Sequence, residues 1–302
     1  MSGGAHGPAT PRHARLSPPP DEPPPLDGTL HPTMARAWAE ICSRGDAQQA
    51  EVAEVLDADA CGFLPGGGTR FESSRNWSGA RVVPTGGHRF QFAAGRWRVP
   101  RLTPGSAPDP SGLDRRSSVW LGFGGHRSWS RALPQIGTFD IEGAPDRHLP
   151  FVQWWIRGNP RSGALVLRRP GIGPGDRILC LLWLRSPGVA AFYVLNADSR
   201  DPPVAGCIHS PDEAVPAAGV SAEWIVERPR DPATRTLHPL ANFGIVELSD
   251  CAAGAAGVPE RLAGTGRLHR MIARLEHPHR SRCIAEPRRG TDSHGSVAVR
   301  FR

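Results

Sequence analysis

Lysine is absent from the 302 residues, and all 36 side chains counted as Lys or Arg are arginines. They stand singly or in pairs, such as Arg115–Arg116 and Arg288–Arg289, and form no run that would make a basic arm. The formal net charge of +7 therefore indicates a solvated basic surface, and we expect no nucleic-acid partner. Binding of nucleic acid through the arginines is the alternative that this charge leaves open.

Long apolar runs are also missing. No stretch reaches the roughly 18 apolar residues that a membrane-spanning helix needs, so no membrane partner is expected. The N-terminus has no basic start followed by an apolar core, so it predicts no secretion signal.

The six cysteines are widely spaced and include no C-x-x-C pair, which argues against the usual zinc site. Cys180 stands in the run ILCLLWL and is expected to be a small buried hydrophobe. One or two disulfides among the other cysteines remain open. HPH at 277–279 offers two imidazoles but no third ligand, so we expect neither a metal nor a cofactor.

Glycine (35) and proline (32) together exceed a fifth of the chain, which disfavours a mainly helical protein. Residues 1–31 are Pro-rich with few large apolar side chains, and are expected to be disordered. Residues 32–70 are interpreted as a short helical extension of two helices, ending in the PGGG linker at 65–68. Residues 71–302 are expected to form one β-sandwich domain, and we expect a monomer.

In this last region, short segments of strand character alternate with Gly/Pro/Asp turns. About a dozen of them at this spacing predict an antiparallel sandwich or barrel, and therefore an all-β fold. The expected strands are 76–83, 88–100, 118–125, 138–142, 150–158, 164–170, 177–185, 189–197, 221–229, 243–250, 269–276 and 296–302.

Among these segments, SAEWIVERP at 221–229 carries a candidate proton-transfer group. Period-two alternation places Glu223 on the face opposite Trp224 and on the same face as Ile225. A carboxylate beside apolar neighbours on a sheet face has a raised pKa and suits general acid–base chemistry. A solvated strand glutamate is the alternative.

Other catalytic or modification motifs are weak. There is no G-x-S-x-G elbow for a serine nucleophile, and His126 near Ser128 and Ser130 is a loop cluster of ordinary composition. Asn76 stands in an N-x-S acceptor sequence for glycosylation, but without a secretion signal that interpretation is weak.

An ordered set of motifs, from about Ser74 to the C-terminus, resembles the glutamic endopeptidases, also called eqolisins. The most specific pieces are NWSGA at 76–80, AEWIVE at 222–227 and LANFG at 240–244. The supporting pieces are VWLGFGG (119–125), LPQIGT (133–138), QWW (153–155) and GPGD (173–176).

The resemblance implies a lectin-like (concanavalin A-like) antiparallel β-sandwich and a polypeptide substrate. It implies a catalytic pair made of Gln135 and Glu223, with Trp120 and Trp154 lining the substrate cleft. In such a pair, an ionised Glu223 takes a proton from water, and the amide of Gln135 donates to the oxyanion. Family membership also implies secretion and an acidic operating pH.

The chain departs from the fungal members of that family. Gly124 stands where they have an acidic residue, and Ile156 lies in place of part of a Tyr-Glu-Trp-Tyr run. Asp140 is offset by one position from another family carboxylate. With fewer carboxylates around Glu223, its pKa is perturbed differently. A weakened or inactive sandwich that binds a peptide or glycan is therefore the alternative function.

Overall fold

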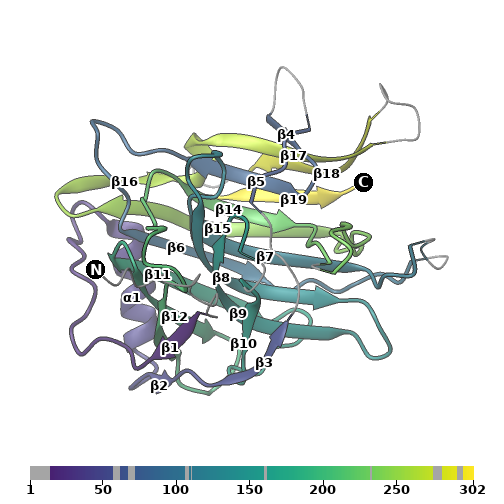
Figure 1. Cartoon of the computed structure of the whole chain (residues 1–302). Coiled ribbons are helices and arrows are strands. Elements are labelled where there is room, and N and C mark those ends of the chain that lie inside the picture. Colours follow the sequence, from purple (N-terminus) through teal and green to yellow (C-terminus); the bar gives the residue numbers. More distant parts are fainter. Residues whose placement is uncertain are drawn as a thin grey trace, which may run out of the picture.

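The computed structural model describes residues 14–56, 62–66, 72–105, 109, 111–159, 162–231, 233–274, 281–290 and 295–302. In these ranges the regular structure is mostly β-strand, with one α-helix and one short 3-10 helix at Ala263–Thr265 (Figure 1). The all-β prediction is confirmed. None of the helices in these ranges is long and apolar enough to span a bilayer.

Most of the strands follow the predicted segments. In chain order they are β1 (Arg15–Ser17), β2 (Gln48–Gln49), β3 (Val52–Leu56), β4 (Glu72–Ser74), β5 (Trp77–Val82), β6 (Phe92–Arg98), β7 (Arg116–Phe123), β8 (Ala132–Ile141), β9 (Arg147–Ile156), β10 (Ala164–Leu167), β11 (Arg177–Ser186), β12 (Val189–Asn196), β13 (Val204–His209), β14 (Ala222–Glu227), β15 (Ile245–Ala255), β16 (Val258–Leu262), β17 (Arg267–Arg274), β18 (Ser281–Arg289) and β19 (Val297–Phe301).

Pairing joins the strands into one continuous, mainly antiparallel sheet that folds into two layers. The first layer follows the order β3-β10-β9-β8-β7-β14-β5-β17. The connection runs through β18 and β19 into the second layer, β15-β6-β11-β12-β13-β1. The predicted antiparallel β-sandwich is therefore present.

Alternation along the strands fills the space between the layers. On β14, Ala222, Trp224 and Val226 face the inter-layer core, whereas Ile225 belongs to a separate apolar cluster on the outer face of the first layer. The indole of Trp224 reaches across the layers and donates to the carbonyl of Ala94 on β6. The other residues of β14, including Glu223, therefore face away from the main core.

The N-terminal segments differ from the prediction. One helix, α1 (Pro32–Cys42), forms where two were expected, and residues 48–56 contain β2 and β3 instead of a second helix. Val52 and Val55 stand three residues apart, a helical spacing, but valine is β-branched and also favours strands. The free edge of β10 supplies backbone partners for the extended form.

Residues 14–31, part of the segment expected to be disordered, are placed against the sandwich. Arg15–Ser17 forms β1 on the edge of β13, and the Ser17 hydroxyl lies 2.8 Å from Nε2 of His209. Edge pairing satisfies the backbone without needing large apolar side chains. This explains how a Pro-rich segment is ordered here.

The helix α1 covers an apolar patch on the outer face of the second layer, to which it contributes Met34, Ala37 and Ile41. Its N-terminus has no side-chain cap of its own. Instead, the carboxylate of Glu260 accepts the backbone N–H of Thr33 at 3.0 Å. The extension is thus an integral part of the sandwich.

The described cysteines are all free thiols. Cys180, Cys207 and Cys251 are buried, Cys42 is exposed and Cys283 is partly exposed. The buried position of Cys180 confirms its interpretation as a small hydrophobe. No disulfide links these five, while Cys61 and HPH at 277–279 lie outside the described residues.

Candidate active site

Gln135 and Glu223 lie on the two strands that flank β7. Gly122 of β7 is the register partner of Gln135 on β8 and of Glu223 on β14. Directly opposed residues in an antiparallel sheet project to the same face. The two side chains therefore flank Gly122, and their backbones are separated by two strand spacings, about 10 Å.

Gly122 keeps the space between these side chains open. A Cβ at this position would lie 2.7 Å from the carbonyl oxygen of Pro134 and 2.9 Å from Cβ of Gln135. Any larger residue would fill the gap that separates the carboxamide from the carboxyl group. The glycine is therefore required by the close approach of its neighbours.

The cross-strand register extends from Gln135 to the next strand on one side and from Glu223 to the next two strands on the other. Gln153 on β9 is the partner of Gln135, Arg81 on β5 is the partner of Glu223, and Arg267 on β17 is the partner of Arg81. We call this cross-strand set the site row. It consists of Gln153, Gln135, Gly122, Glu223, Arg81 and Arg267.

Glu223 is completely buried, which raises its pKa to about 8. The Ser221 hydroxyl, the Arg81 charge and the backbone N–H of Gly124 act in the opposite direction but do not offset burial. The Gly124 N–H donates to Oε2 at 3.0 Å. Within the described part of the chain, Oε1 of Glu223 has no hydrogen-bond partner.

Gln135 is also completely buried, and a second glutamine orients it. Its Nε2 donates to Oε1 of Gln153 at 2.9 Å, and Gln153 in turn donates to the carbonyl of Ser162. Oε1 of Gln135 finds no hydrogen-bond partner among the described residues. Two unpaired acceptors, one from each member of the pair, therefore lie on either side of Gly122.

The backbone of Gly124 leaves no room for a side chain. Its φ of +85° belongs to the left-handed region, and a Cβ there would lie 2.6 Å from Oγ of Ser130. A side chain is excluded at this position. The environment of Glu223 is set by a backbone donor instead of a second carboxylate.

Trp120 lies on the outer face of the first layer, the face that carries Gln135 and Glu223. Its indole donates to Oε2 of Glu227 at 2.8 Å, and its ring meets Trp77 edge-on at a centroid distance of 5.0 Å. Asn76 also donates to Glu227, at 3.0 Å, and is completely buried. Asn76 is therefore a structural residue of this network and not a glycosylation acceptor in the folded chain.

Trp154 and Asp140 do not lie with the pair. The side chain of Trp154 belongs to the inter-layer core, on the opposite face of β9 from Gln153, so its expected place in the cleft is wrong. Asp140 is buried on β8 and bonds Nδ1 of His148 at 2.8 Å. By alternation it faces away from Gln135, and burial raises the pKa of Asp140 to about 6.

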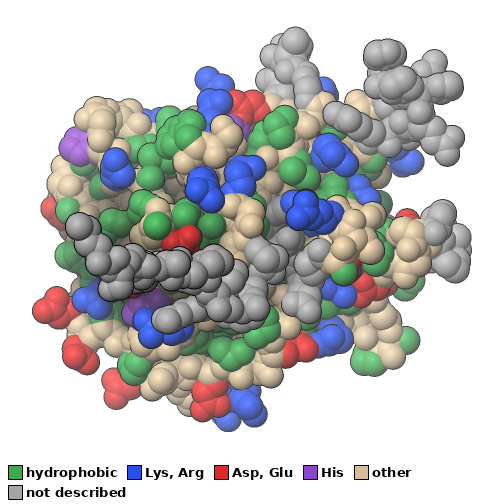
Figure 2. All heavy atoms as spheres, viewed as in Figure 1, with side chains coloured by type: hydrophobic (Ala, Val, Ile, Leu, Met, Phe, Trp, Pro, Cys, Tyr) green, Lys and Arg blue, Asp and Glu red, His purple; other side chains and the backbone are tan. Residues whose placement is uncertain are grey.

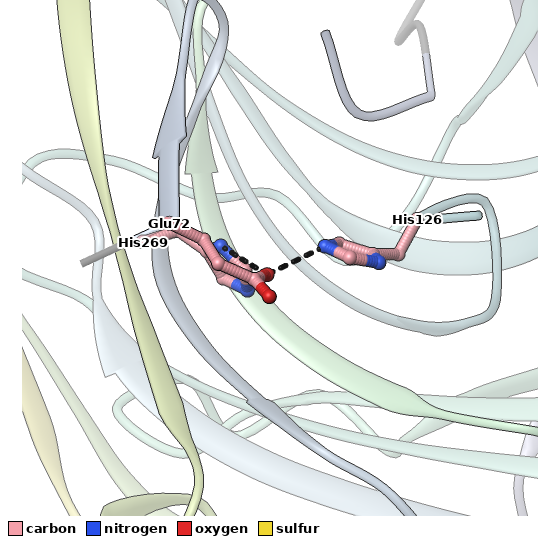
Figure 3. Close-up of side chains that lie close together, drawn as sticks. All are labelled: Glu72, His126 and His269. Atoms are coloured by element: carbon pink, nitrogen blue, oxygen red, sulfur yellow. Dashed lines mark hydrogen bonds and ion pairs between the residues drawn. The ribbon is translucent and has the colours of Figure 1, made fainter. Parts of the chain in front are cut away.

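A second polar cluster stands beside the site row (Figure 3). Glu72 on β4 places Oε2 at 2.8 Å from Nε2 of His126 and 3.4 Å from Nδ1 of His269. These ligand atoms all lie within 4.8 Å of one another, a spacing that suits a divalent cation. However, Arg81 and Arg267 already bind the Glu72 carboxylate, at 3.2 Å and 3.1 Å, and their charge opposes a cation there.

Residues 62–64 lie over part of the site face. The backbone N–H of Phe63 donates to the carbonyl of Gly125 at 3.2 Å, and its ring meets Trp77 at a centroid distance of 5.8 Å. Gly62 has no room for a side chain, because a Cβ would lie 2.6 Å from the ring of Trp155. This contact contributes to the complete burial of the site.

Comparison with known families assigns the chain to one of them. The model of the Peptidase A4 family matches residues 75–276, which contain the site row from Arg81 to Arg267. The chain belongs to the Peptidase A4 family, the eqolisins. It is accordingly a hydrolase of the glutamic peptidase type, and its substrate class is polypeptide.

Solved eqolisins share the fold at low sequence identity. Scytalido-glutamic peptidase with a transition state analog inhibitor matches at 17% identity and a TM-score of 0.59, covering 76% of this chain and 98% of that one. SCP-B, an eqolisin solved with the tripeptide Ala-Ile-His, matches at 17% identity and a TM-score of 0.54, with the same coverage of the two chains. Aspergilloglutamic peptidase from Aspergillus niger matches at 19% identity and a TM-score of 0.50, covering 62% of this chain and 99% of that one. No curated protein matches the sequence.

Several residues of the site were not predicted. Gln153 stands in the QWW motif at 153–155, but the motif alone does not reveal that it holds Gln135. Gly122 stands in VWLGFGG, where its role depends on strand register. Arg81 carries no sequence signal of its own, because its neighbour Glu223 is far away in the chain.

Proposed function

We propose that this eqolisin is an endopeptidase in which Glu223 and Gln135 together activate a water molecule. The observation that carries the proposal is the pairing of both residues with Gly122 on one face of the sheet. A water that donates one proton to Oε1 of Glu223 and the other to Oε1 of Gln135 would satisfy two buried acceptors that lack partners among the described residues.

The reaction follows from this placement. The carboxylate of Glu223 takes a proton from the water as the water oxygen bonds to the scissile carbonyl carbon. The second N–H of the Gln135 amide, not used by Gln153, donates to the developing oxyanion. Protonated Glu223 then gives its proton to the leaving nitrogen as the C–N bond breaks, which yields a carboxylic acid and an amine.

The operating pH follows from the environment of Glu223. Only the ionised form is a base, and burial raises the pKa of Glu223 to about 8 from an ordinary value of 4.5. Water entering with the substrate lowers the pKa towards the ordinary value. We therefore place the rising limb of activity between pH 4.5 and about pH 8, an interval that extends from acidic to neutral pH.

A protease assay tests the proposal. Purified full-length chain is incubated with a denatured polypeptide over a pH series, beside Glu223→Gln and Gln135→Ala. Cleavage by the wild type and its loss in both variants support the proposal, and no cleavage at any pH contradicts it.

The alternative is a non-catalytic sandwich that binds a peptide or glycan. Complete burial of both Gln135 and Glu223 favours it, because a peptide bond must reach the pair before any chemistry. Binding of a peptide that persists unchanged in Glu223→Gln, without cleavage by the wild type, is the result that selects this alternative.

A further inference from the structure

A cavity of about 340 Å³ opens on the far side of Glu223 from Gln135. Its lining contains four arginines and no acidic residue. The arginines are Arg81, Arg127, Arg261 and Arg267.

The cavity is continuous with the site row. Arg81 is the register partner of Glu223, and Arg267 is the register partner of Arg81. Arg127 follows in the loop whose Gly124 N–H binds Glu223. The arginines therefore begin one strand spacing, about 5 Å, beyond the proposed catalytic carboxylate.

The positive charge of this cavity is largely uncompensated. Glu72 pairs with Arg81 at 3.2 Å and with Arg267 at 3.1 Å. Among the described residues, no carboxylate lies within ion-pair distance of Arg127 or Arg261. One carboxylate thus faces four guanidinium groups.

The imidazoles beside Glu72 are neutral and add no charge to the cavity. Burial lowers the pKa of His126 to about 4 and that of His269 to about 3, so both are neutral near neutral pH. Both imidazoles lie against Oε2 of Glu72 (Figure 3), the oxygen that also pairs with Arg81.

Two of the guanidinium groups have unused donors. The Nε atoms of Arg81 and Arg261 are buried and have no hydrogen-bond partner in the described part of the chain. Arg81 is only 5% exposed. A buried donor of a charged group without an acceptor is unfavourable, so these atoms indicate a place for an anionic ligand.

Other surfaces of the molecule also carry many arginines, so an arginine-rich lining is not what sets this cavity apart. Arginine side chains are spread over the face seen in Figure 2, among acidic and apolar ones. A larger groove of about 890 Å³ on the second layer is also lined by arginines, but most of them are paired. The pairs there are Arg96 with Glu40 and Asp250, Arg98 and Arg177 with Asp198, and Arg288 with Glu286.

We propose that the cavity formed by Arg81, Arg127, Arg261 and Arg267 binds a carboxylate of the polypeptide substrate, close to the scissile bond and on one side of it only. The inference rests on the proposed function, because it takes the bond to be cleaved between Glu223 and Gln135. The carboxylate belongs either to an Asp or Glu side chain or to the end of the peptide. The spacing of Arg81 and Arg267 from Glu223 places it within about two residues of the cleaved bond.

Matched peptides test this assignment. The peptides share one cleavage site, and each pair differs by Glu or Gln at a single position near that site. Every peptide is made with a free and with an amidated C-terminus. Binding to the full-length chain is measured by calorimetry and cleavage by kcat/KM. The variants are Arg127→Gln and Arg267→Gln, which change exposed side chains of the cavity and are expected to fold. Arg200→Gln is the control, because it removes the same charge at an exposed position outside the cavity.

We expect a Glu peptide to bind about tenfold more tightly than its Gln counterpart, at positions on one side only, with the preference falling as salt rises. Either cavity variant should reduce this preference severalfold, mainly through KM, while Arg200→Gln leaves it intact. If amidation has the effect instead, the carboxylate is that of the peptide terminus.

The outcomes separate the two proposals. Cleavage without any preference for a carboxylate, or a preference that both cavity variants retain, overturns the assignment of the cavity and leaves the peptidase proposal standing. Carboxylate-dependent binding that requires Arg127 and Arg267, without cleavage of any peptide, supports the cavity and contradicts the Glu223/Gln135 mechanism.

Discussion

Gln135 and Glu223 are both register partners of Gly122, one from each neighbouring strand. This single relationship brings together residues from distant parts of the chain on one face of the first layer. It also leaves one unpaired acceptor on each side of the glycine, counted over the described residues. The position of the proposed nucleophilic water follows directly from it.

Gly124→Ala is expected to damage the site more than an ordinary glycine substitution. Both Gly124 (φ +85°) and Gly112 (φ +70°) are left-handed, but a Cβ at Gly124 meets Oγ of Ser130 at 2.6 Å, whereas at Gly112 nothing lies within 4 Å. Gly112→Ala should cost about 1 kcal/mol of unfolding free energy. Gly124→Ala should cost more and reduce kcat, because its N–H binds Glu223.

Denaturant unfolding and kcat measured on both variants check this prediction. Equal losses of stability, with full activity in Gly124→Ala, would show that the backbone donor is not needed.

Gln135→Ala should lower kcat by about 10²–10³-fold, with a small change in KM, because its second amide N–H is proposed to donate to an oxyanion that forms only during the reaction. Gln153→Ala should have a smaller effect of about tenfold, since Gln153 orients Gln135 without touching the substrate. Steady-state kinetics on the two variants check the order. A larger loss for Gln153→Ala than for Gln135→Ala would assign the donor role to Gln153.

Glu223→Gln should stabilise the fold increasingly as pH rises. Burial raises the pKa of Glu223 to about 8, above its ordinary value of 4.5. Between these values the folded chain keeps a proton that the unfolded chain has released, so the unfolding free energy of the wild type falls as pH rises. The variant lacks this penalty, and its Tm advantage should grow from about pH 4.5 to about pH 8.

Thermal unfolding over this pH range measures the effect, and Glu247→Gln, at an exposed carboxylate on β15, controls for the change in net charge. A Tm difference between Glu223→Gln and the wild type that does not depend on pH would mean that Glu223 is not buried as a neutral group.

Trp154→Phe and Trp120→Phe should separate stability from activity. Trp154 lies in the inter-layer core, and its indole N–H has no partner among the described residues, so the change should cost about 1 kcal/mol of stability and leave KM unchanged. Trp120→Phe removes the donor to Glu227 beside the site and should lower activity. Unfolding and kinetic measurements on both variants test this division, and a raised KM in Trp154→Phe would restore its expected role in the cleft.

The sequence predicts most of the sandwich, since strands bounded by Gly/Pro/Asp turns can be recognised locally. It misses the short strands β1 to β4, and also β13, β16 and β18. Pro287 and a row of arginines obscure β18, and Gly206 interrupts β13. The valines of β3 have helical spacing, and the strand forms because the free edge of β10 supplies backbone partners.

The candidate pair is also predictable, because Gln135 and Glu223 each stand in a local motif. The residues that surround the pair cannot be predicted in this way. The arginines of the second cavity come from segments far apart in the chain, and register alone brings Arg81 and Arg267 next to Glu223. The face of Trp154 was misjudged because QWW places two tryptophans in succession, and alternation sends Trp155, not Trp154, to the site face.

The pH dependence of kcat/KM for one peptide, in the wild type and Glu223→Gln, tests the central claim most directly. The account predicts a rising limb governed by one ionisation between about 4.5 and about 8, and a loss of at least about 10²-fold in Glu223→Gln at every pH. Activity that is retained in Glu223→Gln with the same pH profile would contradict it.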